Sequence, residues 1–72
     1  MELIEVSEKQ RLGREEVAGR LRELADQLAR HNEVEFERGG VRFRTHVPDE
    51  VDFKFEFEIE DGETELELEL SW

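Results

Sequence analysis

The sequence predicts an α+β domain in which one helix packs on one face of a largely antiparallel, curved sheet, with the element order β-α-β-β-β-β. Three observations support this prediction. Apolar and acidic residues alternate over residues 51–72, leucines recur at helical spacing over residues 13–30, and two glycine-containing turns separate alternating segments. Alternation is typical of strands with one buried face, whereas a repeat of three to four residues is typical of an amphipathic helix. We expect a single domain over residues 1–72, because the composition shows no linker.

The first element is predicted over residues 2–10. Ile4 and Val6 lie on one side of this segment, and Glu5 and Ser7 lie on the other. The signal is short, so we expect an edge or terminal strand.

The second element is a helix over residues 13–30. Gly13 is an acceptable N-cap, Glu16 lies at the third helical position, and His31 with Asn32 suits the C-terminal end. The opposite side of the helix is charged. The apolar stripe that we expect to face the sheet consists of Val17, Leu21, Leu24 and Leu28.

A β-hairpin follows, with Gly39-Gly40 as a two-residue turn. This turn sets Phe36 opposite Phe43 on the inner face. On the outer face it sets Glu37 opposite Arg42 and Glu35 opposite Arg44, which are complementary pairs. The connection at residues 48–50 keeps odd-numbered residues inward, so we expect one continuous sheet with Thr45 beside Phe53 and Val47 beside Val51.

The last hairpin turns at Asp61-Gly62 and has one apolar face and one acidic face. The register that a two-residue turn requires pairs Phe57 with Leu66, Phe55 with Leu68, Phe53 with Leu70 and Val51 with Trp72. On the other face it pairs Glu60 with Glu63, Glu58 with Glu65 and Glu56 with Glu67.

The charge of the chain limits the classes of partner. With 21 acidic and 10 basic residues the net charge is -11, so we expect neither nucleic acid nor an anionic membrane as a partner. Only Lys9 and Lys54 are lysine, and arginine supplies the other basic residues. Such a composition suggests adaptation to a cytoplasm of very high salt, where at ~1 M salt the screening length falls to about 3 Å. No secretory signal begins the sequence, so we expect a cytoplasmic protein.

The predicted sheet offers more apolar surface than one helix can cover. A helix is ~10 Å wide and therefore covers only two or three strands that are about 4.8 Å apart. The sheet must either curl strongly around the helix or pack on a second copy, and we favour a homodimer. The expected interface residues are Phe53, Phe55, Phe57, Leu66, Leu68, Leu70 and Trp72.

The sequence resembles the amphi-Trp domain family over almost its whole length. The resemblance rests on the helix start Arg14-Glu15-Glu16, the segment 21–25, the glycine-turn hairpin, and the alternating C-terminal segment 68–72 that ends in tryptophan. It implies a small acidic protein of a kind frequent in haloarchaea, with amphipathic C-terminal strands. The family has no assigned activity, so the resemblance supplies no catalytic residues.

We expect no catalytic residue, metal site or cofactor. His31 and His46 have no cysteine or third ligand at a useful spacing, and a flat row of glutamates cannot surround a cation. The sequence therefore predicts a non-enzymatic domain that self-associates or binds another protein through its apolar sheet face. The alternative is a small-molecule or peptide binder with a pocket between helix and sheet, lined by Phe36, Phe43 and Trp72.

Overall fold

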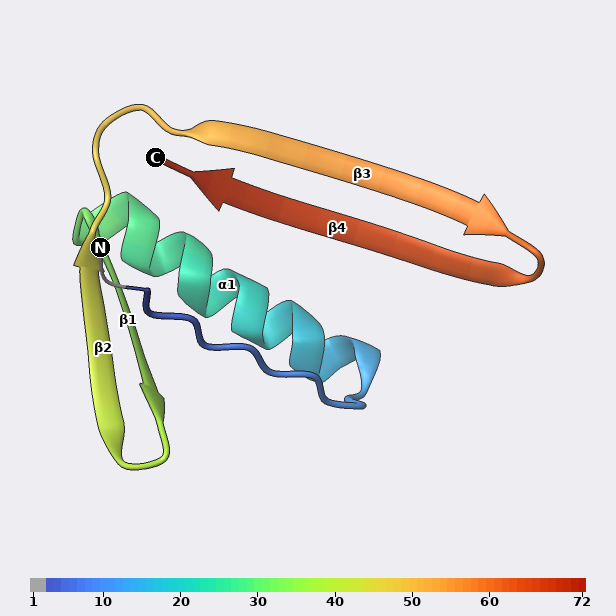
Figure 1. Ribbon diagram of the computed structural model, residues 1–72, viewed down its shortest axis with the longest axis horizontal. Helices are drawn as coiled ribbons and strands as arrows, with labels where there is room; N and C mark the ends of the chain where they lie inside the picture. Colours follow the sequence, from blue (N-terminus) through green and yellow to red (C-terminus); the bar gives the residue numbers. More distant parts are fainter. Residues whose placement is uncertain (1–2) are drawn as a thin grey trace.

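The computed structural model describes residues 3–72, which form one helix and four strands (Figure 1). In chain order the elements are α1 (Arg14–Arg30), β1 (Glu33–Arg38), β2 (Val41–His46), β3 (Asp52–Glu60) and β4 (Glu63–Ser71). The predicted α+β class is confirmed, and so is the predicted order from the helix onward. The described chain measures 38 × 30 × 29 Å.

The strand predicted over residues 2–10 does not form in the part that the structure describes. Residues 3–13 run as an extended segment to the start of α1 without pairing in a sheet, and Glu2 lies outside the described residues (Figure 1). Ile4 is 74% exposed. Near the middle of the segment, Glu8 lies 3.4 Å from Arg38 and 4.0 Å from Arg20.

The helix forms as the sequence predicts. Gly13 has an extended backbone and provides no side-chain cap, while Glu15 and Glu16 place negative charge in the first turn. At the other end the His31 N–H donates to the Gln27 carbonyl. Asn32 then takes a positive φ of 51°, the left-handed conformation that commonly ends helices.

Strands β1 and β2 form the predicted hairpin. Gly39 and Gly40 have φ angles of 59° and 79°, which identify a type I′ turn. The register is as predicted, and the rings of Phe36 and Phe43 stack with centroids 5.1 Å apart. On the outer face, cross-strand ion pairs join arginines to glutamates: Arg44 to Glu33 at 2.7 Å, Arg44 to Glu35 at 3.2 Å and Arg42 to Glu35 at 3.1 Å.

Gln27 connects the helix to the hairpin. Its side-chain amide donates to the Glu35 carbonyl at 3.2 Å, and its carbonyl accepts from the Glu35 N–H at 3.1 Å. The amide thus bonds to β1 as a neighbouring strand would. Nearby, the Val47 N–H donates to the Asn32 carbonyl at 2.9 Å, and within residues 3–72 Val47 is the only buried side chain, at 7% exposure.

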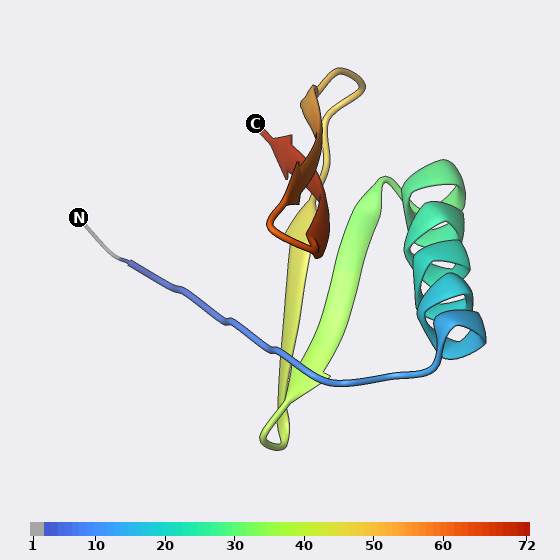
Figure 2. The same cartoon turned by 90° about the vertical axis from the view of Figure 1, so that its right-hand side faces the viewer.

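The prediction of one continuous sheet is wrong. Strands β1 and β2 form one two-stranded sheet, and β3 and β4 form another, so Thr45 does not pair with Phe53 and Val47 does not pair with Val51. Figure 2 shows the β3–β4 hairpin standing apart from α1.

The two hairpins have opposite hydrogen-bonding phases, which explains why they do not join. In a two-residue hairpin the pair next to the turn is hydrogen-bonded, and every second pair follows it. In the first hairpin that pair is Arg38 with Val41, on the same face as the two phenylalanines. In the second it is Glu60 with Glu63, on the acidic face. A regular antiparallel sheet that joined β2 to β3 would therefore place arginines of β2 beside phenylalanines of β3.

Candidate protein-binding surface

The β3–β4 hairpin forms in the predicted register. Asp61 and Gly62 have φ angles of 43° and 81°, again a type I′ turn. Phe57 lies opposite Leu66, and the pairs along both faces follow to Asp52 opposite Ser71. The ladder ends there, so the predicted pairing of Val51 with Trp72 is not part of it.

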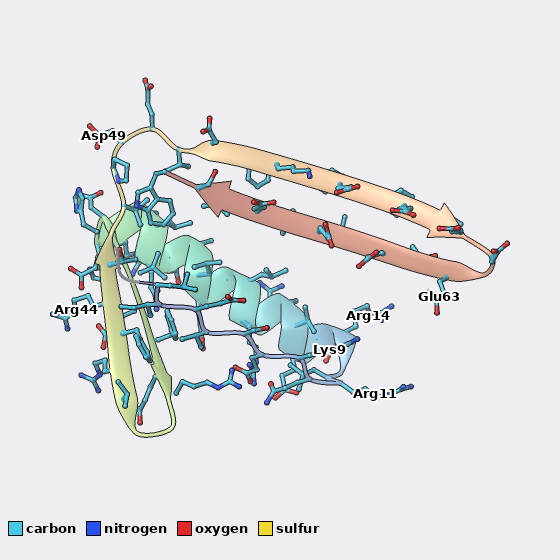
Figure 3. All side chains as sticks on the ribbon, in the orientation of Figure 1. Lys9, Arg11, Arg14, Arg44, Asp49 and Glu63 are labelled. Atoms are coloured by element: carbon cyan, nitrogen blue, oxygen red, sulfur yellow. The ribbon has the colours of Figure 1, made fainter. Side chains whose placement is uncertain are left out.

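One face of this hairpin is apolar and exposed. Successive side chains of a strand alternate between the two faces, so the glutamates occupy the opposite side, and Figure 3 shows oxygen atoms along the near side of both strands. We call the apolar side the hairpin face. It consists of Phe53, Phe55, Phe57, Ile59, Leu66, Leu68 and Leu70.

The hairpin face has no cover from the rest of the described chain. Apart from half-buried Leu70, its side chains and Trp72 are between 46% and 67% exposed. Aromatic side chains can bury about 150–250 Å² each, so the exposed part of this surface is on the order of 700 Å². Monomers seldom expose a contiguous apolar patch beyond about 300–600 Å². The exposed apolar surface is also close in size to the ~800 Å² that each partner contributes to a standard protein interface.

Helix α1 leaves part of its own apolar stripe exposed. It contacts β1 but neither β3 nor β4. Leu24 and Leu28 are half-buried, whereas Val17 and Leu21 are 41% and 47% exposed. The first half of the helix thus lacks the sheet that the sequence predicts beneath it.

The opposite side of the hairpin is strongly acidic. Residues 51–72 hold nine of the 21 acidic residues but only one of the ten basic ones. That base, Lys54, lies 3.5 Å from Glu56. The carboxylates of Glu65 and then Glu56 raise the pKa of Glu67 above its ordinary value. The carboxylates of the acidic face therefore repel one another, whereas the hairpin face carries no charged side chain.

Within residues 3–72, Phe36 and Trp72 border different depressions. A depression of about 690 Å³ is bordered by Phe36 and by polar side chains from the end of α1 and from both strands of the first hairpin. Trp72 borders a different depression, beside Val51. The stacked pair Phe36 and Phe43 and the terminal Trp72 therefore do not share either of these two depressions.

Each histidine lies at the end of an element. His31 is the C-cap of α1, and His46 lies opposite Glu33 in the register of the first hairpin. Within residues 3–72 no three His, Cys, Asp or Glu side chains lie close enough to hold a metal ion. In the same range the helix is neither long nor apolar enough to cross a membrane.

The match to a protein family identifies the chain. The model of the Amphi-Trp domain matches residues 1–72, which is the whole chain. The chain belongs to the Amphi-Trp domain family. A search of curated proteins and a search of solved structures each returned no match. The amphipathic segment and terminal tryptophan of this Amphi-Trp domain correspond to the β3–β4 hairpin and to Trp72, which directly follows β4.

Sequence reasoning missed two residues, one on the hairpin face and one on α1. Ile59 is 67% exposed at the tip of the hairpin face, and its odd-numbered position beside Phe57 was a sufficient signal. Gln27 was not singled out, because a lone glutamine within a helix gives no sign that its amide bonds to a strand.

Proposed function

We propose that this Amphi-Trp domain is a non-enzymatic module that self-associates or binds another protein through the hairpin face. The observation that carries the proposal is the exposed apolar surface on a hairpin that contacts no other helix or strand of the described chain. In water, covering such a surface is favourable by roughly 25 cal/mol for each Å² removed from solvent.

A second copy is the partner that the proposal favours. The two-fold interface of a homodimer uses the same surfaces of both chains, so each copy would cover the exposed surface of the other. The remaining chain buries almost nothing, which supports a domain whose core is completed by association.

The acidic face supports a cytoplasmic protein adapted to high salt. A dimer would bring together two chains that each carry a net charge of -11. At physiological ionic strength the screening length is about 8 Å, and at 1 M it is about 3 Å. Concentrated salt would therefore weaken the repulsion between carboxylates and so favour both folding and association.

Substitutions on the hairpin face test the proposal. Phe55→Glu or Leu68→Glu would place a charge within the interface, so we expect the dimer dissociation constant to rise at least about 100-fold, and the fold to be lost with the dimer. The measurement is sedimentation equilibrium in concentrated potassium chloride, with circular dichroism for folding. Glu58→Gln, on the acidic face of the same strand, is the matched control. If Phe55→Glu stays folded and keeps the wild-type mass, the hairpin face is not the interface.

A further inference from the structure

The edge of β2 is open, whereas the edge of β1 is occupied. The Gln27 amide bonds to β1 at Glu35, so the helix occupies that edge. Among the helices and strands of residues 3–72, β2 contacts only β1, and Figure 2 shows β2 on the side of β1 that faces away from α1. An open strand edge is a template for pairing with another strand.

The phase of the first hairpin decides which residues of β2 offer backbone groups to this edge. Phe36 and Phe43 form a hydrogen-bonded pair, so the N–H and C=O groups of Phe43 point toward β1. Those of Arg42 and Arg44 point outward. The two bonds between Glu35 and Gln27 agree with this phase, because they require the Glu35 groups to point away from β2.

The phase of the second hairpin is the reverse. Glu63, Glu65, Glu67 and Glu69 direct their backbone groups toward β3. The outward groups along the free edge of β4 therefore belong to the alternate residues of the hairpin face, Leu66, Leu68 and Leu70, and to Thr64.

For a pairing between β2 and β4, these phases select the parallel direction. In an antiparallel pair, residues with groups directed at each other lie opposite, so Arg44 would share a face with a leucine. In a parallel pair, a residue whose backbone groups point toward the neighbouring strand lies beside a residue whose backbone groups point away from the first strand. Parallel pairing thus places Arg42 and Arg44 beside glutamates of β4, and Phe43 beside leucines.

We propose that two copies exchange their C-terminal hairpins, with β4 of each copy added in parallel to the open edge of β2 in the other. The inference rests on the proposed self-association and names its geometry. Charge complementarity supports it. The side chains of Arg42 and Arg44 are 65% and 58% exposed, so each can meet a further carboxylate besides those that it contacts on β1. Pairing of β4 with β4 of the second copy would instead align two rows of glutamates, which repel.

Charge reversal in two separate chains tests this exchange. Variant A carries Arg42→Glu and Arg44→Glu, and variant B carries Glu65→Arg and Glu67→Arg. Each homodimer would then place like charges side by side at both junctions, and we expect its dissociation constant to rise about tenfold or more. Mixing A with B would restore opposite charges at both junctions. We expect the heterodimer to form more tightly than either homodimer, although variant A still lacks the ion pairs of Arg42 and Arg44 with its own β1.

The controls separate failure of the exchange from failure of self-association. The measurement is native mass spectrometry after mixing, at the lowest ammonium acetate concentration that keeps the wild type dimeric. Arg22→Glu with Arg30→Glu, a matched reversal on α1, should leave the homodimer intact. A monomeric wild type would contradict self-association itself. A dimeric wild type whose variant A associates normally, or whose variants A and B form no heterodimer, would overturn the exchange and retain self-association.

Pairing within one chain and pairing of β4 with β4 give different results. Pairing within a chain would leave a monomer in every mixture, which also overturns the exchange. If variant B associates more tightly than the wild type while variant A is unchanged, β4 pairs with β4. In that case the junction proposed between β2 and β4 is wrong.

Discussion

At the residue scale, Gln27 and Glu67 show how single polar side chains shape this domain. The Gln27 amide provides two hydrogen bonds to β1 and closes one sheet edge. Glu67, in contrast, is repelled by neighbouring carboxylates, which raise its pKa. A carboxyl group whose folded pKa is raised binds its proton more tightly in the folded state. It therefore favours folding at acidic pH, and this contribution is lost as the pH rises through the raised pKa.

We expect Glu67→Gln to stabilise the hairpin at neutral pH in dilute buffer, because the substitution removes the repulsion from Glu65 and Glu56. The gain should shrink as the pH falls toward the ordinary pKa of 4.5, where the wild-type carboxyl becomes protonated, and it should also shrink in concentrated salt. Urea unfolding at neutral and acidic pH measures this difference. Glu5→Gln, in the extended N-terminal segment, is the control. An effect of Glu67→Gln that does not change with pH would contradict the electrostatic cause.

At the element scale, local turn chemistry determines each hairpin but not how the hairpins join. The registers of both hairpins and the limits of α1 could be predicted, since Gly39-Gly40, Asp61-Gly62 and the alternation act over a few residues. The prediction that the two hairpins join in one sheet was wrong. It considered which residues face inward, but it did not consider which backbone groups of each strand point toward the neighbouring strand. That signal was present, since Arg38 and Val41 flank one turn on its apolar face whereas Glu60 and Glu63 flank the other on its acidic face.

The strand over residues 2–10 could not be settled from local pattern, because a strand needs a partner whose edge is free. The residues of the proposed interface were predicted from alternation alone, yet alternation does not say whether a face becomes core or surface. Only the arrangement of the helix beside β1 shows that Phe53 and Phe55 stay exposed. The sequence thus shows which residues form the apolar face, and the tertiary structure shows that this face is exposed to solvent.

Two glycine substitutions should have opposite effects on stability. Gly19 lies within α1 and a Cβ there would meet nothing within 4 Å, so Gly19→Ala should stabilise the chain by about 0.5–1 kcal/mol. Gly62 has a φ of 81°, so Gly62→Ala should destabilise the hairpin by about 1 kcal/mol or more. Urea midpoints of both variants give the comparison. A destabilising Gly19→Ala would mean that another surface packs on that side of the helix.

At the scale of the whole molecule, the chain has little core of its own and much apolar surface to cover. Val47 is the single buried side chain of residues 3–72, while the hairpin face and the first half of α1 remain exposed. A domain of this size is marginally stable at best when it folds alone. Association at high salt would both complete the core and screen the acidic face, so folding and assembly should occur together.

The most direct test of this account is the molar mass of the wild-type chain, measured by light scattering in ~2 M potassium chloride, a concentration chosen to screen the acidic face. The account predicts a mass of two chains, twice 8.6 kDa. It also predicts that dilution into low salt lowers the mass and the helical signal together. A folded species with the mass of one chain would contradict it, because the hairpin face would then need no second copy.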